Sequence, residues 1–138
     1  MKEKFELENI FGKGIENTAY AEYFIGKSYL NPLPVKALNI TNVTFEAGCR
    51  NNWHIHKATA GGGQILLCIA GEGWYQEENK PARRLKAGDV VEIPANVKHW
   101  HGATKNYNFA HLAIALAGEN LANEWCEPVN DTEYNALD

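Results

Sequence analysis

The chain has 138 residues, a formal net charge of −4 at pH 7 and 45% hydrophobic residues. This length and composition suit one domain with a real core. The acidic balance argues against nucleic acid and anionic membranes as partners, because both select a basic face. The longest apolar run, residues 65–70, is far shorter than the roughly 18 residues of a membrane helix.

The N-terminal stretch MKEKFELENI is charged and lacks the apolar run of a signal peptide. Three cysteines without a metal-binding or redox spacing favour a reducing compartment. We therefore expect a cytoplasmic protein. Residues 1–36, with the breaks GKGIEN and NPLP, show no convincing helical period. We predict that they form an arm that packs on the rest of the domain or on a second subunit.

Residues 37–117 contain short strand-like runs separated by Gly, Pro and Asn. In chain order these runs are ALNITNVTF, NNWHIH, GQILLCIAGEG, GWYQE, DVVEI and FAHLAIAL. Their regular spacing predicts an all-β sandwich or barrel. The stretch LKAGD is expected to be a tight turn that leads into the strand DVVEI.

The last segment, residues 118–138, has a different pattern. Residues 119–125 and 132–137 are each expected to form a short helix, with Asp131 as the N-cap of the second. We therefore predict a helical tail after the β domain.

Four of the five histidines form two His-x-His pairs. On a strand, residues two apart point to the same face, so His54 and His56 project together, as do His99 and His101. Paired imidazoles are costly to bury without partners, and a divalent metal ion is the usual reason to place them together. The alternative for a single pair is ordinary hydrogen bonding in the core. Two pairs in one small domain favour the metal.

The fifth histidine, His111, shares a strand face with Ala113 and Ala115. Small neighbours leave space beside the ring and suit a cavity. Histidine titrates near neutrality, so His101 and His111 are candidates for acid–base catalysis. The alternative for His101 is a supporting hydrogen bond to another group of the site.

Two segments resemble the paired motifs of the cupins. Residues 48–71 read G-x5-H-x-H-x7-Q-x6-G, and residues 88–99 read G-x5-P-x-N-x2-H. The resemblance implies a jelly-roll barrel with one metal ion inside. Carried over by position, the ligands are His54, His56, Gln64 and His99.

Longer stretches, among them AGEGWYQ, LKAGDVVEIPANVKHWHGA and HLAI, are similar to small cupins related to the bacterial manganese-dependent hydroxynitrile lyases. That resemblance implies a glutamine as third ligand and manganese as the metal, with iron, zinc, nickel and cobalt as alternatives. The chain departs from the pattern at the seven-residue spacer KATAGGG, where three or four are usual, and at Asn96 and Ala103 in the second motif. It also has Ala115 where the lyases carry glutamine.

The neutral Gln64 leaves the charge of a divalent ion uncompensated, which strengthens it as a Lewis acid. We therefore expect a metal-dependent enzyme that acts on a small carbonyl- or oxygen-bearing molecule in a pocket like that of the hydroxynitrile lyases. The alternatives are an iron-dependent dioxygenase and a metal-loaded or small-molecule-binding module without turnover. A homodimer is expected, because a lone jelly roll of this size exposes sheet edges.

Overall fold

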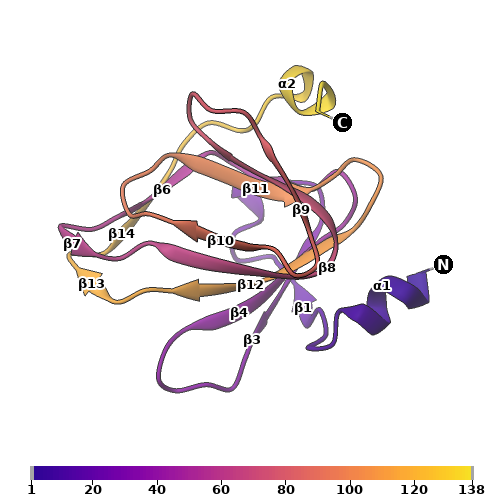
Figure 1. The fold of residues 1–138 in the computed structure, drawn as a ribbon, viewed down its shortest axis with the longest axis horizontal. Helices are drawn as coiled ribbons and strands as arrows, with labels where there is room; N and C mark the ends of the chain where they lie inside the picture. The colour runs from indigo at the N-terminus through magenta and orange to yellow at the C-terminus, as the bar shows by residue number, and fades with distance from the viewer. Residues whose placement is uncertain (1, 138) are drawn as a thin grey trace.

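Strands are the main regular structure of the chain and its helices are short, so the prediction of an all-β fold is confirmed (Figure 1). The computed structural model describes residues 2–137. Its helices are α1 (Lys2–Glu8), the 3₁₀ helix η1 (Ala21–Tyr23) and α2 (Asp131–Asn135). Its strands are β1 (Ile15–Glu16), β2 (Phe24–Ile25), β3 (Ser28–Pro32), β4 (Ile40–Phe45), β5 (Arg50–Asn51), β6 (His54–Lys57), β7 (Ala60–Gly61), β8 (Gln64–Glu77), β9 (Arg83–Lys86), β10 (Val90–Ile93), β11 (His99–Ala103), β12 (Phe109–Ala115), β13 (Gly118–Glu119) and β14 (Ala122–Trp125).

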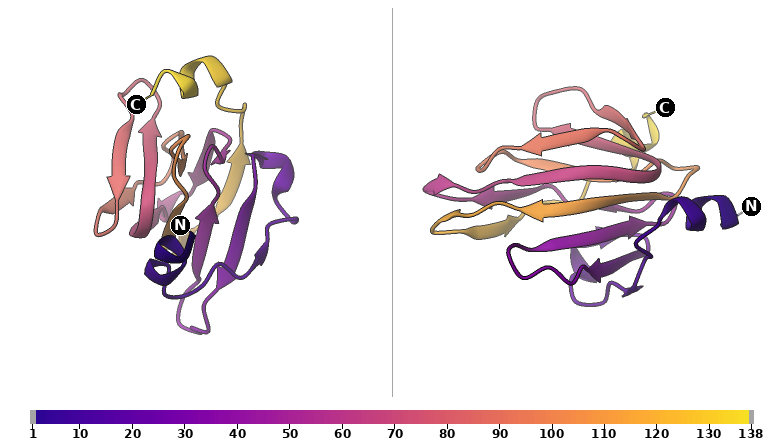
Figure 2. Two further views of the ribbon diagram at one scale, coloured as in Figure 1. Left: turned by 90° about the vertical axis from the view of Figure 1, so that its right-hand side faces the viewer. Right: turned by 60° about the horizontal axis from the view of Figure 1, so that its bottom comes forward.

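The strands curl into two antiparallel layers that share β8 (Figure 2). The first half of β8 pairs with β10 and β12, and its second half pairs with β9 and β11. Pairing with β12 ends at Gly71, which has φ +76°, and pairing with β11 begins at Gly73. A left-handed residue favours glycine, so Gly71 lets one continuous strand pass from one layer to the other. The sequence suggested two strands here.

Two apolar clusters stabilise the fold. The larger lies between the layers and includes Phe45, Leu66 and Ile93, all fully buried. The smaller lies beneath the C-terminal helix α2, where Trp100 packs with Tyr134. The alternation of buried and outward residues along the first half of β8 and along β10 places Leu66, Cys68, Val91 and Ile93 in the larger cluster.

The N-terminal arm adds two features to the expected picture. Residues of α1 form a helix that the sequence did not suggest, because seven residues are too few for a 3.6-residue period to repeat. The helix is held by tertiary contacts: the Asn9 side chain donates to Thr44 Oγ1 at 3.0 Å and accepts from Asn42 at 2.8 Å. Strand β1 extends the sheet of its own chain by pairing with β3.

The expectation of a helix at residues 119–125 is wrong. Those residues contain the end of β13 and all of β14, and β14 pairs with β6 along its whole length. Pairing with an open strand edge overrides weak local helix propensity. The second expected helix is present as α2, but its N-cap is Asn130, whose side chain accepts from the Glu133 N–H, and not Asp131. Within residues 2–137, we find no helix with the length and apolar character needed to cross a membrane.

Candidate metal centre

Three of the predicted ligands come together at one end of the cavity between the layers. His54 and His56 lie on β6, and His99 lies opposite His54 on the neighbouring strand β11. Their ligating nitrogen atoms all lie within 4.8 Å of one another. The two His-x-His segments therefore meet because their strands pair, with His54 and His99 in register.

Each of the three rings has the same ring nitrogen engaged. Nδ1 of His54 lies 2.8 Å from the Asn52 carbonyl oxygen, and Nδ1 of His99 lies 2.9 Å from the Val97 carbonyl oxygen. Nδ1 of His56 lies 2.8 Å from Asn123 Oδ1. An oxygen acceptor requires Nδ1 to carry the proton, which leaves a lone pair on Nε2. All three lone pairs are thereby available to one ion.

Gln64, the first residue of β8, lines the same cavity as His54 and His56. Its Oε1 is buried without a hydrogen-bond partner, as are Nε2 of His56 and Nε2 of His99. Buried polar atoms are almost always satisfied, and three of the four predicted ligands each carry an unpartnered atom, as a site that binds an ion requires. Three imidazole nitrogens and one amide oxygen suit a divalent transition ion. Gly61, Gly62 and Gly63, all with positive φ, deliver Gln64 to this position.

Burial keeps the imidazoles of His54 and His99 neutral. Desolvation lowers the pKa of His99 to about 4, and desolvation with the neighbouring His99 lowers the pKa of His54 well below its ordinary value. A protonated ring cannot coordinate a cation. The low pKa values therefore keep the Nε2 lone pairs free at neutral pH.

His101 and His111, the predicted acid–base pair, lie together but outside the ligand trio. His101 Nδ1 lies 3.0 Å from His111 Nε2, and the two ring centroids are 4.8 Å apart. The ring of His101 lies 5.9 Å from that of His99. Desolvation lowers the pKa of His111 to about 3 and that of His101 well below its usual range. Both rings are therefore neutral, and His101 lines the cavity.

Three residues that orient the histidines were missed by the sequence reasoning. Asn51 Oδ1 accepts from the backbone N–H of His101 at 2.9 Å, and its amide nitrogen lies over the same ring. Asn123 contacts His56, and the Trp125 ring lies 4.8 Å from that of His54. Asn51 lies within the first motif, three residues before His54, but the other two lie in the segment expected to be helical. Only the pairing of β14 with β6 brings them to the site.

The cavity beside the histidines has a volume of about 310 Å³. The arm contributes Tyr20 and Phe24 to its wall. Ala113 and Ala115 line it as the sequence suggested, whereas His111 lies behind His101. Among the described residues, none with a charged side chain lines it. The charge of the site would therefore come from the metal ion.

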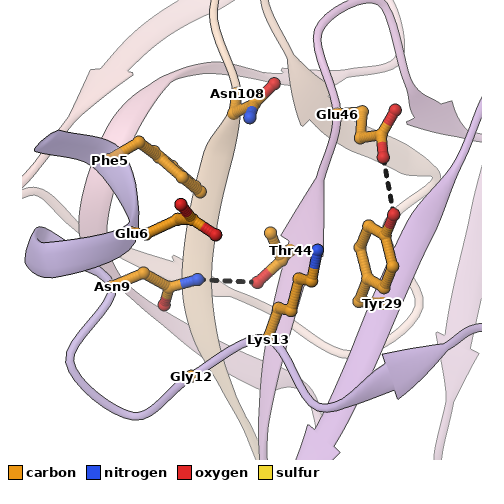
Figure 3. A pocket seen from close by; sticks show the side chains of 9 residues that line it. All are labelled: Phe5, Glu6, Asn9, Gly12, Lys13, Tyr29, Thr44, Glu46 and Asn108. Atoms are coloured by element: carbon orange, nitrogen blue, oxygen red, sulfur yellow. Dashed lines mark hydrogen bonds between the residues drawn. The ribbon is translucent and has the colours of Figure 1, made fainter. Parts of the chain in front are cut away.

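A second hollow of about 320 Å³ lies between α1 and the outer faces of β3 and β4 (Figure 3). Its polar groups bond to one another: Asn9 donates to Thr44, and the Tyr29 hydroxyl donates to Glu46 at 2.6 Å. Lys13 lies 4.4 Å from the centre of the Tyr29 ring. These contacts anchor the arm, and the cluster of potential metal ligands lies in the other cavity.

The chain is similar to a known protein family and to a characterised type of enzyme. The cupin domain family matches residues 41–114. The chain is 39% identical over 118 residues to an (R)-mandelonitrile lyase from Granulicella tundricola, covering 83% of this chain and 87% of that protein.

Solved structures show a similar fold. The fold is similar to a cupin-like protein from Thermotoga maritima, with a TM-score of 0.77, 38% identity, and coverage of 92% of this chain and 95% of that one. A cupin 2 conserved barrel domain protein from Rhodopseudomonas palustris, at 17% identity, shares the fold with a TM-score of 0.65, over 89% of this chain and 83% of that one.

Proposed function

Because this chain belongs to the cupin domain family, we propose that it is a metal-dependent enzyme acting on a small oxygen-bearing molecule. The proposed ligands of one divalent ion, manganese foremost, are His54, His56, Gln64 and His99. The observation that carries the proposal is the cluster of three histidines together with the buried, partnerless Gln64 Oε1, His56 Nε2 and His99 Nε2. Desolvating these atoms without a ligand would cost about 1–3 kcal/mol each.

A divalent ion held by four neutral ligands would supply Lewis-acid polarisation of a substrate hydroxyl or carbonyl. The protein's own part is to orient the substrate and to move a proton. His101 is the proposed proton acceptor, since its neutral ring lines the cavity next to the ligand trio. His111 holds it through the hydrogen bond at His101 Nδ1, and Asn51 holds its backbone. The charge of a proton taken at Nε2 of His101 would be shared between His101 and His111.

The small volume of the cavity limits the substrate to a small molecule. Because no described lining residue has a charged side chain, the substrate should not require a charged side chain as its partner. Its wall is apolar at Phe24, Leu30 and Val43, and polar but uncharged at Asn39 and Thr41. The named relative is an (R)-mandelonitrile lyase, so cleavage of cyanohydrins is the first reaction to test. Ala115 offers no hydrogen bond to a substrate. Loss of one positioned polar contact costs about 1–3 kcal/mol, so we expect weak activity toward cyanohydrins.

The test is a mandelonitrile cleavage assay with added manganese on three proteins. We expect measurable turnover for the wild type, a higher rate for Ala115→Gln and background for His54→Ala. If neither of the first two exceeds His54→Ala, the lyase assignment is refuted. Metal analysis of protein purified without chelators separates the alternatives: iron with oxygen uptake favours a dioxygenase, and bound metal without turnover favours a binding module.

A homodimer is also proposed, and the outer face of the sheet supports it. Register places Leu67 between Val90 and Leu112 on that face, with Ile65 and Ile114 paired one row away. Val90 is 57% exposed. Apolar sheet faces on a monomer mark association surfaces.

We further propose a cytoplasmic location, because Cys49, Cys68 and Cys126 are all free thiols.

A further inference from the structure

The ligand strand β6 is covered on one edge by β14, a strand from the C-terminal segment beyond the matched residues 41–114. In the register of this pair, Asn123 lies opposite His56 and Trp125 lies opposite His54. Directly paired residues on antiparallel strands point to the same face. The alternating Asn-x-Trp of β14 therefore faces the alternating His-x-His of β6, residue for residue.

The three histidines are oriented by acceptors of different kinds. His54 and His99 each bond to a backbone carbonyl two residues away, which the local chain conformation fixes. His56 instead bonds to the side-chain oxygen of Asn123, 67 positions later in the sequence. His56 is also the only half-buried member of the trio in the described structure. Its orientation therefore depends most on a single distant side chain.

The strand that carries Asn123 is held in place by other contacts. The Trp125 ring stacks on Tyr23, with centroids 4.5 Å apart and planes 1° from parallel. Glu124 forms an ion pair with Lys57 at 2.6 Å. These contacts and the β ladder do not involve the Asn123 side chain. Replacing that side chain should thus leave β14 in position and remove one hydrogen bond.

From this arrangement we infer that Asn123 is a positioning residue of the metal centre, which fixes His56 with its proton on Nδ1 and its Nε2 lone pair toward the ion. The inference rests on the proposed metal site and assigns the C-terminal strand to it. Partners that orient metal-bound histidines typically contribute about 10–100-fold to metal affinity. Without Asn123, His56 Nδ1 faces water, and the ring is free to turn or to carry its proton on Nε2.

The test compares the affinity for Zn²⁺, measured by competition with a chromophoric chelator, in four proteins. Relative to the wild type, we expect Asn123→Ala to bind about 10–100-fold more weakly. Asn123→Asp keeps an oxygen acceptor and should restore wild-type affinity or exceed it. Glu124→Ala is the matched control, because it removes a charge from the same strand and leaves His56 its partner. We expect it to change affinity by less than about threefold.

A second readout reports on the ring itself in metal-free protein. Long-range ¹H–¹⁵N spectra distinguish the two neutral imidazole tautomers. They should show His56 protonated at Nδ1 in the wild type and in Asn123→Asp, and partly at Nε2 in Asn123→Ala. Equal Zn²⁺ affinity of the wild type and Asn123→Ala, or a His56 proton on Nε2 in the wild type, would overturn the inference alone. A wild type that binds no Zn²⁺ would overturn the proposed metal centre with it.

Discussion

Replacing Gln64 by glutamate tests the idea that a neutral ligand set leaves the metal charge uncompensated. The change keeps an oxygen donor of similar reach at the start of β8. Gln64→Glu should therefore retain the metal. It adds one negative charge to a cavity with no charged side chain among its described lining residues. A monoanion that binds the ion should bind more weakly to the variant.

The size of the effect follows from the geometry of the site. The histidine nitrogens lie within 4.8 Å of one another, and an anion on the same ion would lie at a similar distance from the new carboxylate. Coulomb's law at that separation gives a repulsion of about 1 kcal/mol in water and about 3 kcal/mol at an effective dielectric constant near 20. We therefore expect azide affinity to fall about 5-fold to 150-fold.

The assay is an azide titration of Co²⁺-loaded protein, followed by visible absorption. Asn39→Asp is the matched control: it adds the same charge at a residue that lines the cavity but that we do not assign as a ligand. Solvent screening should keep its effect near twofold. Equal azide affinity in the wild type and Gln64→Glu would refute the charge argument. Loss of cobalt from Gln64→Glu would refute the placement of residue 64 as a ligand.

Three further predictions concern stability and assembly. Arg50→Met should lower the free energy of unfolding by about 1–3 kcal/mol, because Arg50 is buried and donates to the Val129 carbonyl at 2.8 Å. Urea unfolding measures this loss, and the exposed control Lys86→Met should show little change. Metal-free protein should lose stability as pH falls from 6.5 to 5, because the unfolded chain takes up a proton near 6.5 while the pKa of buried His111 is about 3. His111 alone would contribute about 2 kcal/mol to this loss, and a flat profile, or one unchanged in His111→Leu, would contradict it. Light scattering at micromolar concentration should give twice the 15.4 kDa chain mass for the wild type and a monomer for Leu67→Lys, whereas a monomeric wild type would exclude the dimer.

Much of the candidate site could be predicted from the sequence, because the alternation of side chains along a strand depends only on neighbouring residues. The two-residue spacing put His54 beside His56, and the motif resemblance named Gln64 and His99. The structure brings the three histidines together and leaves Gln64 Oε1, in the lining of the same cavity as His54 and His56, buried without a partner. Whether these residues bind a metal stays a prediction.

The parts that could not be predicted depend on contacts between distant segments. Nothing local shows that Asn123 will face His56, since their pairing is set by an open edge of β6. The helix α1 depends likewise on the bonds of Asn9 to β4. The long strand β8 was divided in the sequence because Gly71 and Gly73 suggest a turn. In the fold, those glycines carry the strand from one layer to the other.

The central claim is one divalent ion held by His54, His56, Gln64 and His99, and anomalous diffraction from a manganese-soaked crystal tests it most directly. We expect a single strong anomalous peak in the cavity, within bonding distance of Nε2 of the three histidines and of Gln64 Oε1. A peak bound through Nδ1 of any of these histidines, a peak elsewhere in the protein, or no peak at saturating manganese would contradict it.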